Sequence, residues 1–102
     1  MEHLEFTYPG KPGAARSRDW AIVGVVTSGN LEIMAEATNL DGACRFVIDT
    51  ATKGFGPIWK AVIEDFMTKH GPADLLFSIN DSAASPAVVS LRLAQVLEAL
   101  KD

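Results

Sequence analysis

The sequence is poor in the groups that would point to several common protein classes. A single cysteine, Cys44, excludes an internal disulfide and a zinc site built from cysteines. Nine Lys and Arg stand against thirteen Asp and Glu, and this net charge of −4 argues against a nucleic-acid partner. The longest apolar run, Ala21–Val26, is far shorter than the roughly 20 residues of a membrane-spanning helix. Because Met1-Glu2-His3 does not begin a signal peptide, we expect a cytoplasmic protein without a membrane partner.

Signatures of catalysis are also missing. The chain contains no phosphate-binding loop, no dinucleotide fingerprint and no nucleophile elbow. Its two histidines, His3 and His70, fall in the N-terminal segment and at the predicted end of a helix, where neither is placed to act as a base. Cys44 is predicted to be a small apolar core residue, because Arg45 points to the other face of its strand and cannot activate the thiol. We therefore expect a subunit, carrier or adaptor without a metal site rather than a complete enzyme.

What is present is a hydrophobic fraction of 48% in 102 residues, enough for one modest core. Residues 1–19 are predicted to be a flexible arm or an edge strand, because apolar and polar residues alternate from Leu4 to Tyr8 before a stretch rich in proline and glycine. Residues 20–102 are predicted to form a single domain.

Hydrophobic periodicity predicts the elements of that domain. A buried strand is expected over residues 20–27, and further strands over residues 31–37, 44–49 and 74–80. One amphipathic helix is expected to begin at Pro57, and a second at Pro86 with Ser85 as its N-cap. The order β-β-β-α-β-α predicts an α+β two-layer sandwich, in which two helices cover one face of a sheet of about four strands.

Two serines are candidates for modification. Ser82 precedes the second predicted helix, as does the modified serine of ordinary acyl carrier proteins, but the small hydrophobic residue that should follow it is missing. We interpret Asp81, Ser82 and Ser85 as a polar turn that caps the helix. Ser28 is expected at or beside the tip of a β-hairpin, where Gly29 leaves its hydroxyl open to a modifying enzyme.

Two segments of the chain resemble a known family. Residues 23–33 read Val-Gly-Val-Val-Thr-Ser-Gly-Asn-Leu-Glu-Ile, and residues 85–95 read Ser-Pro-Ala-Val-Val-Ser-Leu-Arg-Leu-Ala-Gln. The first resembles the cofactor-attachment segment of the acyl carrier (delta) subunit of malonate decarboxylase, and the second resembles the C-terminal helix of that family. The aromatic helix with Trp59 also has its counterpart there, and the citrate lyase gamma chain is a more distant relative. Thr27 and Ser85 depart from the family pattern without removing the acceptor hydroxyl.

The resemblance implies a function for Ser28. Its hydroxyl would carry a 2'-(5''-phosphoribosyl)-3'-dephospho-CoA group, with Gly29 and Asn30 beside the attachment point. This arm would carry acetyl and malonyl thioesters between an acyl transferase subunit and a decarboxylase subunit, after a prosthetic-group transferase has attached it. The tether would raise the effective concentration of each acyl group, and the chain itself would do no catalysis.

Several roles stay open at this point. Arg16 and Arg18 are candidates to neutralise the phosphates of the arm, and Asn30 to hydrogen-bond near them. Arg92 is expected to form either an intramolecular ion pair or a subunit contact. The alternative function is a non-covalent protein-interaction module, for which Ser28 would be dispensable. A small hydrolase that uses Ser28 is disfavoured, because no histidine is placed to activate it.

Overall fold

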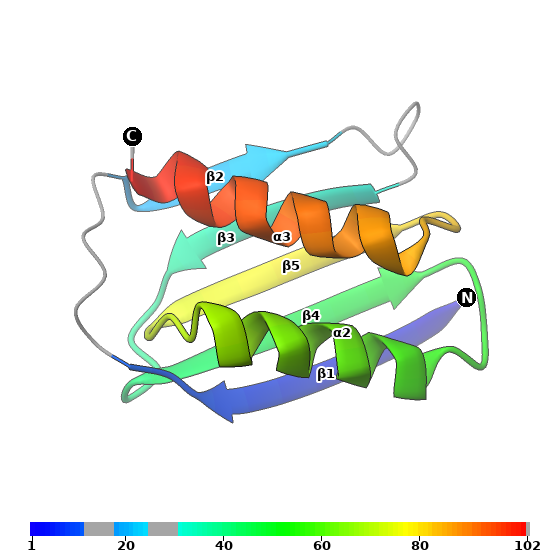
Figure 1. Ribbon diagram of the computed structural model, residues 1–102, viewed down its shortest axis with the longest axis horizontal. Helices are drawn as coiled ribbons and strands as arrows, with labels where there is room; N and C mark the ends of the chain where they lie inside the picture. Colours follow the sequence, from blue (N-terminus) through cyan, green and yellow to red (C-terminus); the bar gives the residue numbers. More distant parts are fainter. Residues whose placement is uncertain (12–17, 25–30, 102) are drawn as a thin grey trace.

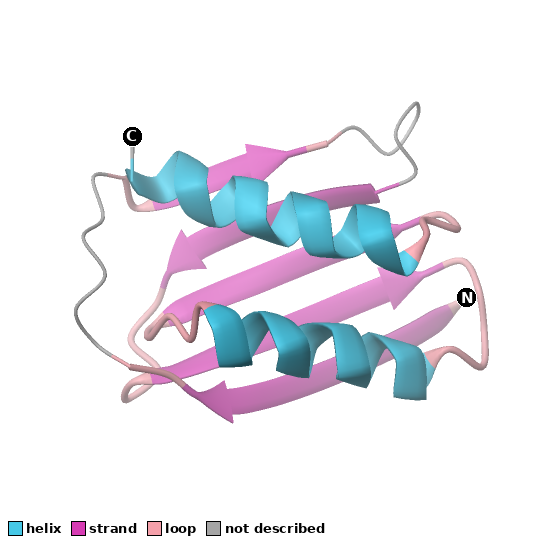
Figure 2. Ribbon diagram, in the orientation of Figure 1, coloured by secondary structure: helices cyan, strands magenta, loops and turns pink. Residues whose placement is uncertain are grey.

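The computed structural model describes residues 1–11, 18–24 and 31–101. These residues form one mixed sheet with two helices on the same face, and the opposite face is open (Figures 1 and 2). The elements in chain order are β1 (Glu2–Pro9), β2 (Trp20–Val23), β3 (Leu31–Ala37), β4 (Ala43–Thr50), α2 (Gly56–Lys69), β5 (Leu75–Asp81) and α3 (Pro86–Lys101). The predicted α+β two-layer sandwich is thereby confirmed.

The strand count is five rather than the four expected. The additional strand is β1, which pairs along its whole length with β4, from Glu2 opposite Thr50 to Pro9 opposite Ala43. Its alternating sequence places Leu4, Phe6 and Tyr8 on the face that the helices cover, where they pack against the core. β1 is therefore an edge strand of the sheet.

The order of strands across the sheet is β1-β4-β5-β3-β2. The two central strands, β4 and β5, are parallel and connected through α2, whereas every other neighbouring pair is antiparallel. Because of these directions, the carboxyl ends of β4 and β5 lie at the same end of the sheet as the start of β3. Asp81 illustrates this, since it pairs with Thr50 on one side and with Leu31 on the other.

Aromatic rings form the centre of the core. Phe46 and Phe77, which are neighbours on β4 and β5, stack with ring centroids 4.8 Å apart. Phe66 of α2 meets both of them edge-on, at 6.1 Å and 5.6 Å. Trp59 and Ile63 of α2 are also buried, and α3 contributes its predicted stripe: Val89, Leu93, Val96, Leu97 and Leu100. Helices and sheet thus share one continuous core.

Strand β2 differs from the buried strand expected over residues 20–27. It is an edge strand, and its described part runs over Trp20–Val23. Only alternate residues are covered, because the helices lie on one face of the sheet. Ala21 is 5% exposed, whereas Trp20 and Ile22, which face the open side, are 61% and 47% exposed. A run of consecutive apolar residues predicts burial on both faces, and the one-sided architecture overrides that prediction.

The helix boundaries follow the signals in the sequence. Pro57 lies in the first turn of α2, and Gly71 follows the helix with a φ of +48°. At the start of α3, the Ser85 hydroxyl accepts a hydrogen bond from the Val88 N–H at 3.3 Å, which confirms the predicted N-cap. No helix among the described residues is long and apolar enough to span a membrane.

Candidate functional site

The predicted attachment residues Ser28, Gly29 and Asn30 lie outside the described residues, as does Arg16. The two ends of their segment are described, however. Residues 25–30, which we call the connecting segment, join Gly24 after β2 to Leu31, the first residue of β3. The candidate site can therefore be built from the residues at the base of this segment.

Gly24 brings the two ends of the connecting segment close together. Its φ is +86°, a left-handed conformation that glycine adopts without steric cost. A Cβ atom at this position would lie 2.1 Å from the carbonyl oxygen of Leu31, which is far inside van der Waals contact. Gly24 and Leu31, which flank the connecting segment, are therefore in close contact. No residue other than glycine fits at position 24 without displacing the backbone.

Arg92 lies against the same point. It belongs to α3, and its Nη1 atom would come within 2.7 Å of a Cβ on Gly24. Its Nε atom is buried and has no hydrogen-bond partner among residues 1–11, 18–24 and 31–101. Those residues also provide no salt bridge to Arg92, so the intramolecular ion pair that was one of its two predicted roles is not found in the described part.

A guanidinium whose buried Nε has no partner among the described residues has a chemical consequence at this position. Burying part of a charged group without a hydrogen-bond acceptor is costly, and the cost is removed when an anion supplies the acceptor. Guanidinium binds carboxylate and phosphate oxygens through two parallel hydrogen bonds. The base of the connecting segment, formed by Gly24 and Arg92, is therefore suited to hold an anionic group.

The close approach at Gly24 gives a stability prediction. We expect Gly24→Ala to lower the free energy of unfolding by about 1–3 kcal/mol through backbone strain, with a further loss from the clash with the Leu31 carbonyl. Gly42→Ala is the matched control, because Gly42 has a φ of +87° but open space where its Cβ would be. Urea unfolding of both variants measures the difference in the free energy of unfolding. Equal losses of stability would show that the contact with the Leu31 carbonyl adds nothing to the cost of the left-handed backbone.

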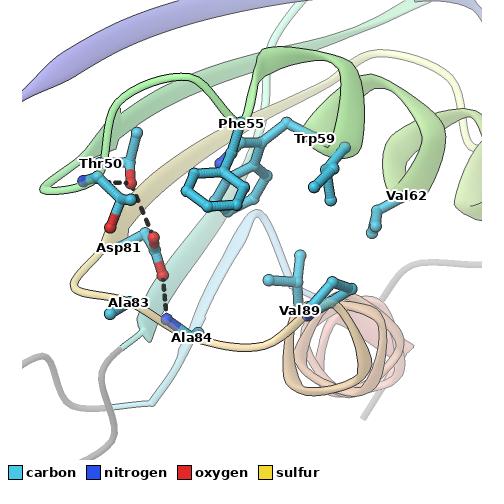
Figure 3. A pocket seen from close by; sticks show the side chains of 11 residues that line it. Thr50, Phe55, Trp59, Val62, Asp81, Ala83, Ala84 and Val89 are labelled. Atoms are coloured by element: carbon cyan, nitrogen blue, oxygen red, sulfur yellow. Dashed lines mark hydrogen bonds between the residues drawn. The ribbon is translucent and has the colours of Figure 1, made fainter.

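A pocket of about 220 Å³ opens at the same end of the sheet. Figure 3 shows Phe55, Trp59 and Val62 of the α2 region on one side and Val89 of α3 on the other. Most of the lining is apolar. Trp59 is 6% exposed, whereas Phe55 and Ile58 are each 43% exposed at the pocket.

Two polar side chains form the inner wall of this pocket. The Thr50 hydroxyl donates a hydrogen bond of 2.8 Å to Oδ2 of Asp81 (Figure 3). Oδ1 of Asp81 accepts a second bond, of 2.9 Å, from the Ala84 N–H. Asp81 is 8% exposed, and both of its carboxylate oxygens are satisfied. These bonds form the polar turn before α3, and Ser82 lies exposed within that turn.

The remaining candidates are not brought to this site. Arg18 lies at the opposite end of the sheet, where its N–H donates to the Leu100 carbonyl near the end of α3. Cys44 is fully buried, and burial raises the pKa of its thiol to about 12, so the predicted structural role is confirmed. His3 is exposed, with its pKa raised by hydrogen bonds to Asp49 and Glu5.

The described residues contain no group of three or more His, Cys, Asp or Glu side chains that could hold a metal ion. The sequence analysis did not identify the pocket, and it named Arg92 only for an ion pair or a subunit contact, not for its place beside Gly24. The pocket lining comes from two separate stretches of chain, residues 50–62 and 81–89, and no single motif identifies it. For Arg92, its inclusion in the resembling helix was the one available signal.

Comparison with known proteins identifies relatives over the whole chain. A family described as "Malonate decarboxylase delta subunit (MdcD)" matches residues 18–100. The chain is 50% identical over 101 residues to the malonate decarboxylase acyl carrier protein of Xanthomonas campestris pv. campestris (strain B100), which covers 99% of this chain and 96% of the relative. The corresponding protein of Bradyrhizobium diazoefficiens is 47% identical over 102 residues, covering 100% and 97%.

A solved structure shares the fold. One chain of a Pseudomonas malonate decarboxylase hetero-tetramer, determined in complex with malonate, superimposes with a TM-score of 0.85 at 34% sequence identity. The match covers 98% of this chain and 99% of that chain. Fold, length and sequence therefore agree between this chain and the relatives.

Proposed function

The chain belongs to the family of malonate decarboxylase acyl carrier (delta) subunits, and from this premise we propose that Ser28 is the residue to which its prosthetic group is attached. The group we propose is 2'-(5''-phosphoribosyl)-3'-dephospho-CoA, joined through a phosphodiester to the serine hydroxyl. The observation that carries the proposal is the match over residues 18–100, which includes Ser28 in its Ser-Gly-Asn-Leu-Glu setting.

The residues at the base of the connecting segment fit such a group. A phosphodiester is an anion, and the Arg92 guanidinium next to Gly24 has a buried Nε without a partner in the described residues. Arg92 would hold a phosphate oxygen of the linkage and so limit the directions in which the arm leaves the domain. This role replaces the ion pair considered for Arg92 from sequence.

The chemistry of the arm determines what the prosthetic group contributes and what the protein contributes. When bound, the group supplies a thiol, whose thioesters activate acetyl and malonyl groups for transfer and for decarboxylation. Ser28 contributes the attachment oxygen, and the sheet contributes a rigid base for the segment that holds it. Because this chain needs no acid or base of its own, we propose a non-catalytic subunit that works in the cytoplasm with acyl transferase and decarboxylase subunits. A prosthetic-group transferase would load it.

Intact mass measurement tests this proposal. The protein is purified from cells that also express its neighbouring genes, and its mass is compared with the mass of the unmodified chain. We expect a gain larger than that of a phosphopantetheine arm, located by peptide mapping on residues 23–33 at Ser28. A smaller gain on Ser82 would contradict the assigned site, and an unmodified chain from cells that decarboxylate malonate would contradict the carrier function.

The alternative is a non-covalent interaction module, and one observation favours it. Trp20 and Ile22 are 61% and 47% exposed on the open face of the sheet, where a large aromatic side chain is suited to contact a partner protein. The two functions differ in their dependence on Ser28, because a module that acts by surface contact alone does not need the hydroxyl.

A further inference from the structure

The apolar pocket between the two helices has no role in the function proposed so far. Phe55, Trp59 and Val62 face Val89 across it, and the Thr50 and Asp81 pair closes it on the inside (Figure 3). An apolar cavity of about 150 Å³ is enough to bind a benzene-sized molecule. At about 220 Å³, this pocket has room for a short acyl group, the thioester sulfur and the methylene carbons next to it.

The pocket lies close to Leu31, the residue at which the connecting segment ends. Asp81, in the wall of the pocket, is the sheet partner of Leu31, the residue that directly follows the segment. Neighbouring strands are about 5 Å apart, so one strand spacing separates that wall from the strand on which the segment ends. A CoA-like arm that starts in the segment is many bonds longer than this spacing, and its thiol end can return to the domain at this position.

We infer that this pocket binds the acetylated thiol end of the arm carried by Ser28 and shields its thioester from water. The inference rests on the carrier function proposed above. Hydrolysis of the thioester requires water to add to the carbonyl carbon, after which the carbon–sulfur bond breaks and acetate and the free thiol are released. Burial of the thioester between Trp59 and Val89 keeps water from that carbon without blocking the arm's return to a partner subunit.

The charge in the wall makes the pocket selective between the two acyl groups. Acetyl is uncharged, whereas malonyl carries a carboxylate. The carboxylate of Asp81 is largely buried and faces the same space, and like charges repel strongly where little water screens them. Among residues 1–11, 18–24 and 31–101, no cationic side chain lines the pocket to offset this repulsion. The pocket therefore accepts the acetyl form and rejects the malonyl form.

Trp59 provides a direct readout of this binding. The chain has two tryptophans, and Trp20→Phe leaves Trp59 as the single one. Trp20 is 61% exposed, so this change should leave the fold intact. In this background we would record the Trp59 emission of the full-length chain in its unmodified, thiol, acetyl and malonyl forms, each verified by intact mass. We expect the acetyl form to shift the emission and the malonyl form to match the unmodified chain.

A pocket-filling variant gives a second readout. Ala84 lines the pocket and Ala87, three residues away, is exposed outside it, so Ala84→Phe and Ala87→Phe form a matched pair. We expect the acetyl thioester to hydrolyse about fivefold faster in Ala84→Phe than in the unsubstituted chain, and at an unchanged rate in Ala87→Phe. The Trp59 comparison does not depend on whether Ala84→Phe folds.

The outcomes separate this inference from the carrier function. A loaded chain whose Trp59 emission is the same in the acetyl and malonyl forms would overturn the pocket assignment and leave the carrier function standing. A change in Trp59 emission that occurs only when the other subunits are added would also overturn the pocket assignment, because the pocket would then bind a side chain of a partner. A chain that gains no mass at Ser28 would overturn both.

Discussion

Replacement of Ser28 by alanine should abolish loading of the prosthetic group and, with it, malonate decarboxylation by the assembled complex. The alanine side chain has no oxygen to esterify, and acyl groups on free CoA do not reach the effective concentration that a tether provides. We expect the activity to fall by at least about 100-fold. The free energy of unfolding should change by about 0.5 kcal/mol or less, because the described core lies between the helices and the sheet.

Two measurements on this variant are needed together. Intact mass reports loading, and turnover of malonate by the reconstituted complex reports function. Ser82→Ala is the matched control, since Ser82 is the other candidate serine of the chain and is exposed in the turn that follows β5. It should be loaded and active like the unsubstituted chain. Full activity of Ser28→Ala would instead favour the non-covalent interaction module.

Replacement of Phe46 by alanine should have the largest effect on stability. Phe46 is fully buried, stacks on Phe77 at 4.8 Å and meets Phe66 edge-on. Because β4, β5 and α2 all contribute to this cluster, removing the ring leaves a cavity where the two layers meet. We expect the free energy of unfolding to fall by about 3–5 kcal/mol, measured by urea denaturation.

The same substitution at an exposed phenylalanine separates burial from residue type. Phe55 is 43% exposed, and Phe55→Ala should cost about 1 kcal/mol or less. Similar losses for the two variants would contradict the central place of Phe46 in the core. A chain of this size has a total stability of about 5–15 kcal/mol, so Phe46→Ala removes a large share of it.

Local signals in the sequence were sufficient to predict most of the helices and strands. Pro57 and Pro86 marked the helix starts, the Ser85 hydroxyl caps α3 as predicted, and the stripe of α3 is buried as its spacing requires. Each of these features depends on residues three or four positions apart. The chemistry that determines them is therefore visible in a short window of sequence.

Long-range pairing was not accessible in the same way. The alternation from Leu4 to Tyr8 allowed a strand, but nothing in those residues identifies β4, some forty positions later, as its partner. The apolar run that begins at Trp20 gave no indication that the helices cover only one face of the sheet. The pocket depends on Thr50, Trp59 and Val89 together, and their proximity follows from the parallel pairing of β4 with β5.

The candidate site likewise has one part that local sequence predicts and one part that only the fold reveals. Ser28 was predicted from its neighbours in sequence, because a resemblance to a family is a local property. The position of the Arg92 side chain beside Gly24 could not be predicted from sequence, because it depends on how α3 packs against β2. Physical placement, rather than sequence, therefore distinguishes Arg92 from Arg18, which lies at the far end of the sheet.

The strand order also dictates when β2 and β3 can take their final place during synthesis. Strand β3 joins the sheet through β5, and β5 begins at Leu75, so a nascent chain that ends before this residue lacks the strand that connects β2 and β3 to β4. The cover over β2 and β3 arrives later still, with α3 at the C-terminal end. An enzyme that recognises β2 and β3 in their folded arrangement would thus act only after α3 has been synthesised.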